Sequence, residues 1–547
     1  MLLVATLLPQ SFSQPQSQPK PQQPPPPQQQ QSQLPHIFFV VVDDFGWAEV
    51  GYHRETPTPE VKTPAIDTLV KEGVELNRHY VHMMCTPSRS SLQTGRLPVH
   101  IITELAGPCD ANGAIPRNMT GLAAQLKKAG YATHQVGKWD AGMATPHHTP
   151  HGRGYDTSLT YFGHGNWMWS ETEWGGSENH GGWPKEDLVD FWDTDRPAAH
   201  LNGTGYEEDL FRARMLAILA AHDQRTPLFL NYDSKVAHYP LQAPTEYQRA
   251  PHLAAIDDDN RRTYHAMVSY LDDQLANITG TFKALGMWED TLMVLTSDNG
   301  GFVKSPEGGC VTSYATPETP WSDHGHGTSC FDGEAGANNW PLRGGKYSNF
   351  EGGIRVNAFV SGGVLPAAVR GTKLEGIVHV ADWYGTLSKL AGVDPTDEWA
   401  AASGLPPVDS LDVWPLISGA NLTSPRVSFL VTHDLLVHGQ WKYVRGGAKM
   451  IEADWGGPHY PNASTATDPI DAHSFKCPDR GCLYDVVADV EERHEISAQH
   501  PDVVARLSAE LDQLAKTIWS TSHHDDPQCR ETAVARYGGF LGPWKEV

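Results

Sequence analysis

The stretch "HIFFVVVDDFG", residues 36–46, decides the fold. Its unbroken apolar run is typical of a strand that is buried on both faces, as in the centre of a parallel sheet. The stretch "TLMVLTSDNG", residues 291–300, repeats the arrangement. Acid and amide side chains follow the two runs directly: Asp43, Asp44, Asp298 and Asn299. We therefore predict two central strands whose ends bring four oxygen donors to one edge of a sheet.

Helical and strand patterns alternate around these two runs. Helices are predicted within residues 63–74, 118–130, 210–222 and 263–286, and strands within 131–140 and 227–234. Gly130 and Gly286 are the expected helix stops. The alternation indicates an α/β fold with a mainly parallel sheet flanked by helices. Ligands of such folds bind beyond the carboxyl ends of the strands.

The composition of the chain changes along its length. Residues 1–13 combine an apolar stretch with small polar residues and predict a signal peptide, the alternative being a disordered apolar tip. The Pro/Gln-rich run at 14–34 predicts an extended linker. We expect the main domain at 35–424 and a smaller α+β domain at 425–547. After the first residues, we find no run near the roughly 18 apolar residues that a membrane helix needs.

Charge and cysteine content narrow the function classes. The 547 residues carry a formal net charge of −24, which argues against a general nucleic-acid binder. A small anionic substrate is still compatible, since a site can be locally basic. Seven cysteines leave one over after three disulfides. The pairs suggested by position are Cys310 with Cys330, Cys477 with Cys482 and Cys109 with Cys529, so that Cys85 is the odd one.

Five Asn-X-Ser/Thr sites fit a glycoprotein of the secretory route: Asn118, Asn202, Asn277, Asn421 and Asn462. Such triplets also arise by chance, so they add modest weight to the signal peptide. Together these features predict a protein that is secreted or delivered to a lysosome-like or vacuole-like compartment.

The odd cysteine lies in "MMCTPSRSSLQTGR", residues 83–96. The segment after Pro87 can begin a helix, with an anion site at its N-terminus and Arg89 one turn in. Further candidate cations occur in short motifs: Lys138 in "VGKWD", His238 in "AHYPLQAP" and Lys346 in "RGGKYSNFEGG". Taken singly, each lysine is more often a solvated surface charge. The acid and amide donors suit Ca²⁺ or Mg²⁺, the alternative being loop caps.

The stretch "CTPSRSSLQTGR" matches the sulfatase signature, and the chain resembles the type I sulfatases, most closely the arylsulfatase B (N-acetylgalactosamine-4-sulfatase-like) group. The similarity runs from about His36 to the C-terminus and includes "GYATHQVGKW", "HYPLQAP", "TSDNGG" and "NNWPLRGGKYSNFEGG". It implies an alkaline-phosphatase-like fold with a smaller C-terminal domain. It also implies hydrolysis of a sulfated carbohydrate or an aryl sulfate.

The resemblance implies a role for each motif residue. A formylglycine-generating enzyme would convert Cys85 to formylglycine, whose hydrated gem-diol attacks sulfur. Ca²⁺, with Mg²⁺ as the substitute, would be held by Asp43, Asp44, Asp298 and Asn299. The remaining motif residues would activate the nucleophile or bind the sulfate oxygens: Arg89, Lys138, His238 and Lys346.

One position departs from the family pattern. The family usually has Gly-Lys-Trp-His, whereas this chain has "GKWDAG" with Asp140 at the histidine position. Asp140 either turns to another partner or acts as a base toward the second hydroxyl. We expect His148 or a neighbour in "HHTPHGRG" to supply the missing imidazole near residue 85, the alternative being solvated loop histidines. Glu49 replaces a usual aspartate, and we expect it to lie behind the metal ligands.

Two other functions compete with a sulfatase. One is a phosphomonoester or phosphonate hydrolase on the same scaffold, against which the intact "CTPSR" and a single-metal ligand set argue. The other is a non-catalytic protein that binds sulfated glycans, which only Asp140 suggests. Residues 161–176, rich in aromatic side chains, and 302–336 are the expected rims of the substrate site.

Overall fold

The structure is a computed structural model. It describes residues 34–54, 58, 60–173, 188–256, 258–303, 310–312, 328–330, 336–450 and 475–546; for 310–312, 328–330, 449, 450 and 475 this covers the backbone alone. The predicted signal peptide, the Pro/Gln-rich linker up to residue 33, the sequon at Asn462 and most of the 302–336 loop lie outside these residues. Leu34–Val547 forms one compact unit, so the predicted boundary at residue 425 stays a prediction.

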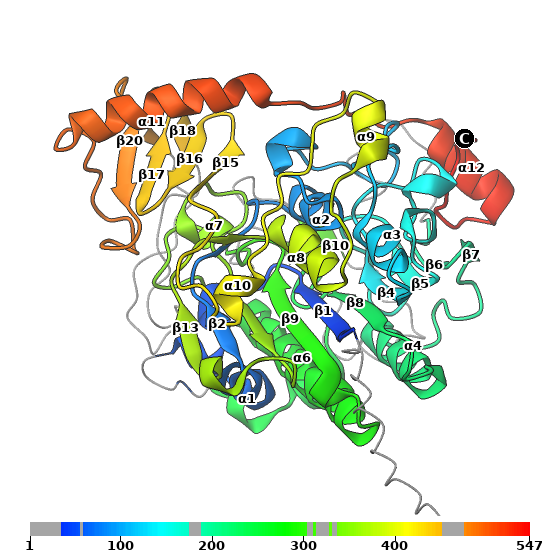
Figure 1. Cartoon of the computed structure of the whole chain (residues 1–547). Coiled ribbons are helices and arrows are strands. Elements are labelled where there is room, and N and C mark those ends of the chain that lie inside the picture. The colour runs from blue at the N-terminus through cyan, green and yellow to red at the C-terminus, as the bar shows by residue number, and fades with distance from the viewer. Residues whose placement is uncertain are drawn as a thin grey trace, which may run out of the picture. The chain divides into compact units, whose positions relative to one another are not determined.

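A ten-stranded sheet forms the centre of this unit, in the order β13-β2-β12-β9-β1-β8-β4-β5-β6-β7 (Figure 1). Its strands are β1 His36–Val42, β2 Val74–Leu76, β4 Ala132–Lys138, β5 Thr157–Tyr161, β6 Trp192–Asp193, β7 Arg196–Pro197, β8 Leu228–Ser234, β9 Thr291–Ser297, β12 Ala358–Ser361 and β13 Thr372–Leu374. The five strands β9, β1, β8, β4 and β5 are mutually parallel. The carboxyl ends of these strands therefore meet at one edge of the sheet.

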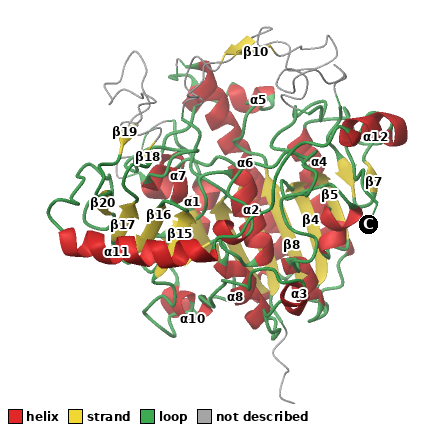
Figure 2. Cartoon of the chain, turned by 90° about the horizontal axis from the view of Figure 1, so that it is seen from above, coloured by secondary structure: helices red, strands yellow, loops and turns green. Residues whose placement is uncertain are grey.

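Helices cover both faces of this sheet (Figure 2). The helices are α1 Pro64–Lys71, α2 Cys85–Thr94, α3 Leu122–Lys127, α4 Glu207–Ala221, α5 Thr245–Gln248, α6 Asp259–Ala284, α7 Glu351–Ile354, α8 Asp382–Leu390, α9 Glu398–Ala402, α10 Trp414–Ile417, α11 Pro501–Leu514 and α12 Gln528–Tyr537. Side chains of α2, α3 and α8 pack with alternate β1 residues on one face, and those of α1, α4 and α6 pack with the others on the opposite face.

The central strand shows why the unbroken apolar run was needed. Phe39 and Val41 lie in one hydrophobic cluster, while Phe38 and Val40 lie in the other. All seven residues of β1 are buried, so neither face of the strand carries a polar side chain to solvent. The predicted α/β fold with a mainly parallel sheet is confirmed.

A small antiparallel sheet follows near the C-terminus. Its strands are β15 Ser428–Thr432, β16 Leu435–His438, β17 Trp441–Val444 and β20 Cys482–Asp485. Helix α11 packs on β16 and β17, as Figure 1 shows. Short strand pairs complete the described fold: β3 His79–Tyr80 with β14 Val378–His379, β10 Cys310–Thr312 with β11 Thr328–Cys330, and β18 Lys449–Met450 with β19 Phe475–Lys476.

The last residues of the chain return to the large sheet. Cys529 of α12 forms a disulfide with Cys109, and Phe540 makes a bridge to Val189. A second disulfide joins Cys477 and Cys482. These two predicted pairs are confirmed, and Cys85 is free and buried. The backbones of Cys310 and Cys330 are opposite one another in the β10–β11 pair, but their side chains lie outside what the structure describes.

No helix within the described ranges is long and apolar enough to cross a membrane.

The two disulfides should differ in their contribution to stability because they close loops of different length. Cys109 and Cys529 are 420 residues apart, whereas Cys477 and Cys482 are 5 apart. Loop-closure entropy is worth roughly 6 kcal/mol for the long loop and roughly 2 kcal/mol for the short one. Replacing Cys109 and Cys529 by serine should therefore lower Tm more than replacing Cys477 and Cys482. Calorimetry at one scan rate checks this, and equal losses would contradict it.

Candidate active site

The site is built at the carboxyl ends of four adjacent parallel strands. Asp43 and Asp44 follow β1, and Asp298 and Asn299 follow β9. Asp44 accepts a hydrogen bond from the Asn299 side-chain amide at 2.7 Å, and its own backbone N–H donates to Asp298 at 3.3 Å. All four side chains are buried. The structure thus brings the four predicted oxygen donors together.

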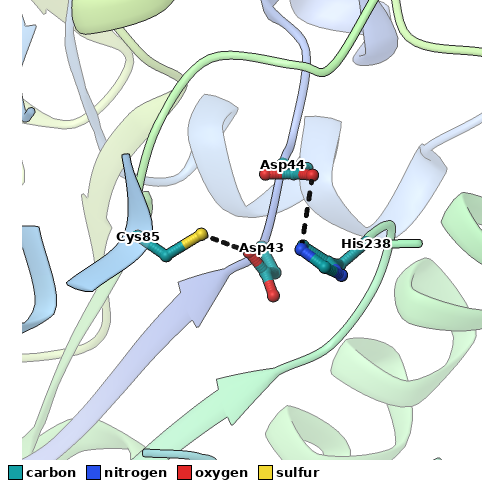
Figure 3. Close-up of side chains that lie close together, drawn as sticks. All are labelled: Asp43, Asp44, Cys85 and His238. Carbon is teal, nitrogen blue, oxygen red and sulfur yellow. Dashed lines mark hydrogen bonds and ion pairs between the residues drawn. The ribbon is translucent and has the colours of Figure 1, made fainter. Parts of the chain in front are cut away.

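Helix α2 places the cysteine over this edge. Cys85 is the first residue of α2, whereas the helix was predicted to begin after Pro87, and the Cys85 Sγ lies 3.7 Å from Asp43 Oδ1. Figure 3 shows Cys85, Asp43, Asp44 and His238 pointing toward a common point from three different segments. Their ligand atoms lie within 4.8 Å of one another.

Arg89 is one helical turn after Cys85 and faces the same carboxylates. Its guanidinium donates to Asp298 at 2.9 Å and lies 3.9 Å from Asp43. It also donates to Asp233 of β8 at 3.4 Å. Asp233 was not among the predicted site residues, although it lies at the end of an apolar strand, as Asp43 does. Burial raises the pKa of Asp233 to about 6, against the effect of Arg89.

Two lysines complete the predicted set of cations. Lys138, the last residue of β4, donates to Asp43 at 2.8 Å, and Lys346 donates to Asp44 at 2.9 Å. Both ammonium groups are buried, so neither is the solvated surface charge that a lone lysine usually is. The backbone N–H of Tyr347 donates to Met83 at 2.9 Å, which ties the Lys346 loop to the residues before Cys85.

Burial and the neighbouring charges shift the pKa values of the ionisable groups in the site. Burial and the Asp43 charge raise the pKa of Asp298 to about 7. Burial, opposed by Lys346, also raises the pKa of Asp44. Burial raises the pKa of the Cys85 thiol well above its usual value, despite the two lysines. A neutral thiol is a poor nucleophile, so the sulfur itself is badly suited to attack.

His238 lies on the loop after β8, with Nε2 3.9 Å from Asp44. Burial holds the pKa of this imidazole well below its usual value, so the ring is neutral. Nδ1 of this ring is bonded to the carbonyl oxygen of Tyr239, so Nδ1 carries the proton of the neutral imidazole. Nε2, which faces Asp44, is therefore a hydrogen-bond acceptor and donates to a bound oxyanion only after it has taken up a proton.

Asp140 lies beside Cys85 without contacting it in any hydrogen bond that the structure shows. Its carboxylate accepts from Thr86 Oγ1 at 2.7 Å and lies 3.4 Å from Lys138 Nζ. The imidazole that reaches it is His164, whose Nδ1 lies 3.2 Å away. His164 is part of the aromatic segment that we expected at the rim, but sequence spacing gave no reason to pair it with Asp140.

The prediction that His148 supplies this imidazole is wrong. His148 Nδ1 bonds Thr145, at 2.9 Å from the hydroxyl, and its ring packs against Gly113. His147 and His151 are exposed. The short helical turn at Pro146–His148 directs the His148 ring back onto its own cap residue, away from α2.

Glu49 lies behind the site, as expected. Its carboxylate accepts from Arg261 and from the backbone N–H of Asn338, both at 2.5 Å, and His265 lies 2.9 Å away. Asn338 begins the loop that carries Lys346. The Glu49–Arg261 ion pair therefore anchors this loop through the bond from the Asn338 backbone to Glu49. The charges of Arg261 and His265 outweigh burial and lower the pKa of Glu49 to about 2.

A pocket of about 950 Å³ lies at a different place, lined by Trp47, Arg54, Trp340, Lys373 and Val487 among others. None of the residues around Cys85 lines it. Two of its cations are already paired, Lys373 with Glu75 at 2.8 Å and Arg54 with Glu60 at 3.6 Å. We therefore place the candidate active site at Cys85 and not in this pocket.

The donor set fits a hard divalent cation. Asn299 Oδ1 is buried and has no hydrogen-bond partner in the described structure, and the buried carboxylates of Asp43, Asp44 and Asp298 lie at the same edge of the sheet. Five aspartates (Asp43, Asp44, Asp140, Asp233 and Asp298) face three permanent cations (Arg89, Lys138 and Lys346), which leaves an excess of two negative charges when all five aspartates are ionised. Without a bound ion, the raised pKa values of Asp44, Asp233 and Asp298 oppose that full ionisation. A divalent ion with oxygen ligands, such as Ca²⁺ or Mg²⁺, cancels that excess.

Three comparisons with known proteins agree with one another. The family model described as "Sulfatase" matches residues 35–393. The mouse protein named arylsulfatase J is 31% identical over 537 residues, covering 93% of this chain and 80% of the relative. An N-acetylgalactosamine-6-O-sulfatase of Bacteroides thetaiotaomicron is 26% identical over 536 residues, covering 89% and 94%.

Among solved structures, Ps i-CgsB in complex with k-i-k-neocarrahexaose superposes with a TM-score of 0.68 at 23% identity, covering 93% of this chain and 99% of that one. At this identity the likeness concerns the fold. It covers the large sheet and the C-terminal region together.

Glu49 offers a test of how the Lys346 loop is held. Glu49→Gln keeps the shape but removes the charge that pairs with buried Arg261, which should cost roughly 3–5 kcal/mol of unfolding free energy. Glu72→Gln, which changes an exposed ion pair 3.8 Å from Lys283, should cost less than about 0.5 kcal/mol. Denaturant unfolding measures both. Equal losses in the two variants would show that the Glu49 ion pair does not anchor the loop.

The pH dependence of the same variant has a defined sign. The folded pKa of Glu49 is about 2 against an ordinary value of 4.5, so its stabilisation is present above pH 4.5 and is lost as pH falls toward 2. The stability difference between the unaltered protein and Glu49→Gln should therefore shrink below pH 4.5.

Proposed function

The chain belongs to the sulfatase family and is a sulfatase, a hydrolase of sulfate esters. On that premise we propose that it releases inorganic sulfate from a sulfated sugar, with formylglycine at position 85 and Ca²⁺ at the carboxylates. One observation carries the proposal: a free, buried cysteine at the start of a helix, at the same sheet edge as three buried cations and the four buried oxygen donors Asp43, Asp44, Asp298 and Asn299.

Formylglycine explains why a cysteine is placed here. The buried thiol has a raised pKa and is a weak nucleophile, and a free thiol outside the disulfides is a liability in a secreted chain. Formylglycine, when hydrated, supplies an oxygen nucleophile in the same position. A formylglycine-generating enzyme is therefore the maturation partner that we propose.

The residues around position 85 have separate tasks. Arg89 and Lys138 lie on the side of Asp43 and Asp298, where they favour an ionised oxygen at residue 85. Lys346 lies on the side of Asp44, where it binds sulfate oxygens and stabilises the leaving oxygen. His238 lies on the same side and joins Lys346 in this role only when its Nε2 is protonated. These groups are held in place before substrate binds, since each is buried and already hydrogen-bonded or ion-paired.

We propose that Asp43, Asp44, Asp298 and Asn299 hold Ca²⁺, with Mg²⁺ as the substitute. The unpartnered Asn299 oxygen and the excess of negative charge support this assignment. When bound, the ion supplies positive charge beside the nucleophile and a sulfate oxygen. The carboxylate and amide ligands disfavour zinc, which prefers nitrogen and sulfur.

The substrate is proposed from the relatives and the site together. One relative is named for a sulfated N-acetylgalactosamine, and the resemblance to the arylsulfatase B group points to the same class. A simple aryl sulfate should be accepted as a model substrate. A secreted or lysosome-like location is proposed from the N-terminal sequence, the disulfides and the exposed sequons at Asn277 and Asn421.

The nucleophile can be tested through the degree of maturation. We expect sulfate release per mole of protein to rise in proportion to the fraction of formylglycine at residue 85, across preparations made with and without the generating enzyme. Cys85→Ala should lower release by roughly 10³-fold or more, because no nucleophile remains, and its Tm should stay within a few degrees. Peptide mass spectrometry and a sulfate assay measure this. Active material that contains only unmodified cysteine would contradict it.

The metal assignment has an independent readout. Elemental analysis of purified protein should find one Ca²⁺ or Mg²⁺ per chain. Asn299→Ala should lower that occupancy after dialysis at low metal concentration, since it removes one ligand, whereas Asn77→Ala, on a half-buried loop away from the site, should not. Stoichiometric zinc without calcium or magnesium would refute the assignment.

A further inference from the structure

We propose that His164 and Asp140 act as one unit, in which protonated His164 offsets the negative charge that Asp140 places beside the sulfate site. The proposal rests on the proposed function, since it concerns how that site admits an anion. His164 acts through Asp140 and is therefore a positioning residue.

The Asp140 carboxylate places a negative charge near the site where an anionic sulfate ester must bind. Asp140 is 1% exposed and lies two residues after Lys138, with its backbone in the left-handed region at φ +46°. Its carboxylate bonds Thr86, the neighbour of the residue 85 nucleophile, at 2.7 Å. Burial alone would raise the pKa of Asp140, but His164, Lys138 and the bond from Thr86 lower it below its usual value. Asp140 is therefore an anion close to the place where a sulfate ester must bind.

The permanent cations do not offset this extra charge. Lys138 is shared between Asp43 at 2.8 Å and Asp140 at 3.4 Å, and Lys346 is paired with Asp44. With a divalent ion bound, the five aspartates and three cations of the site are in balance, and a sulfate ester would bring one further negative charge. A proton on His164 restores the balance at Asp140, a carboxylate that is not among the proposed metal ligands.

The loop around His164 is fixed on both sides. Asp190 accepts hydrogen bonds from the backbone N–H groups of Phe162 and Gly163, at 2.8 and 2.7 Å. Asn166 is bonded to Glu207 at 2.7 Å and to Lys235. Gly165 packs against His238 so closely that an added Cβ would lie 3.1 Å from its Nδ1. The loop therefore holds His164 in contact with Asp140 while it lines the active site.

His164 is also the member of the pair that solvent reaches. Its side chain is 29% exposed, whereas that of Asp140 is 0% exposed. Protons can thus exchange with solvent at the His164 imidazole while its Nδ1 stays in contact with the buried carboxylate. Nδ1 faces Asp140, so the carboxylate fixes which ring nitrogen carries a proton in the neutral form.

Other titratable groups face the same loop and must be separated from His164. His238, against Gly165, stays neutral because burial holds its pKa well below the ordinary value. Asp190 accepts from the backbone N–H of Gly163, and burial raises its pKa to about 7, so Asp190 is a second possible source of pH dependence near this loop. Lys138, on the far side of Asp140, has its pKa raised by Asp43 and Asp140 against the effect of burial, so it keeps its charge.

The test measures binding of inorganic sulfate by calorimetry to the metal-loaded full chain carrying Cys85→Ala, so that no turnover is needed. Against this parent at pH 6, adding His164→Ala should weaken sulfate binding at least fivefold. His164→Gln, which keeps a hydrogen-bond donor but not the charge, should weaken it similarly. Adding Asp140→Asn to His164→Ala should restore affinity to within about twofold of the parent, because the uncompensated carboxylate is gone. Asparagine tolerates the positive φ at position 140.

The pH dependence distinguishes a charge role from a structural one. Sulfate affinity of the parent should fall as pH rises from 5 to 8, and the fall should be absent in the double variant at positions 140 and 164. A fall that persists there would come from other buried carboxyl groups of the site, such as Asp190, Asp233 or Asp298, and would overturn the proposal. The exposed His147→Ala is the matched control and should bind sulfate like the parent.

Two results overturn the proposal outright: His164→Ala that binds sulfate as tightly as the parent, or a loss of affinity that Asp140→Asn does not restore. Tm and bound metal, measured on each variant, show that the comparison is between folded proteins. Sulfate release by the mature unaltered chain is measured separately. If the mature chain releases no sulfate but the variants at positions 140 and 164 bind sulfate as expected, the proposed function alone is refuted. If the chain is active but these variants do not bind sulfate as expected, the pairing of His164 with Asp140 alone is refuted.

Discussion

Mutual repulsion among buried carboxylates at one edge of the sheet is the constraint on which the rest of the site depends. Asp43, Asp44 and Asp298 are buried beside one another, and two carboxylates about 4 Å apart repel by about 4 kcal/mol at an effective dielectric constant near 20. Each permanent cation of the site contacts at least one of them. Arg89 from α2, Lys138 from β4 and Lys346 from a distant loop are in this way fixed around residue 85. The same carboxylates are the proposed ligands of the divalent ion.

Further buried polar groups behind this edge of the sheet hold the loops and side chains of the site in place. Glu49, with Arg261, holds the loop that carries Lys346, and Asp233 holds Arg89 from the other side. The loop of His164 is held by Asp190 and by Asn166. Each of these supports is itself a buried polar group with a partner. The site is therefore rigid because charges buried without partners would be costly.

The sequence predicted those features of the fold and of the site that have local sequence patterns. The apolar run of β1 and the glycine stops after two helices predicted the sheet and its helices, because burial on both faces and helix ends have local signatures. The two acid-bearing strand ends and the "CTPSR" motif predicted where the site lies. The positions of the cysteines along the chain suggested the disulfides Cys109–Cys529 and Cys477–Cys482.

What the sequence did not reveal depends on contacts between distant segments. His148 was chosen for Asp140 because it is near in sequence, but its helical turn points the ring onto Thr145, and His164 reaches Asp140 from the end of the neighbouring strand β5. Asp233 was overlooked because one aspartate after a strand is common. Helix α2 begins at Cys85 and not after Pro87, since proline is tolerated in the first turn of a helix. The order of the strands in the sheet brings His164 to Asp140 and Asp233 to Arg89, and no local sequence pattern encodes that order.

The central claim is that an oxygen held at residue 85 attacks the sulfur atom of a sulfate ester. The most direct measurement is hydrolysis of a sulfated sugar or an aryl sulfate by the mature protein in ¹⁸O-labelled water, with mass analysis of both products. Attack at sulfur places one solvent-derived oxygen in the released sulfate and none in the released hydroxyl group, because the bond between sulfur and the leaving oxygen breaks. Label in the hydroxyl group, with unlabelled sulfate, would mean cleavage at carbon and would contradict the account.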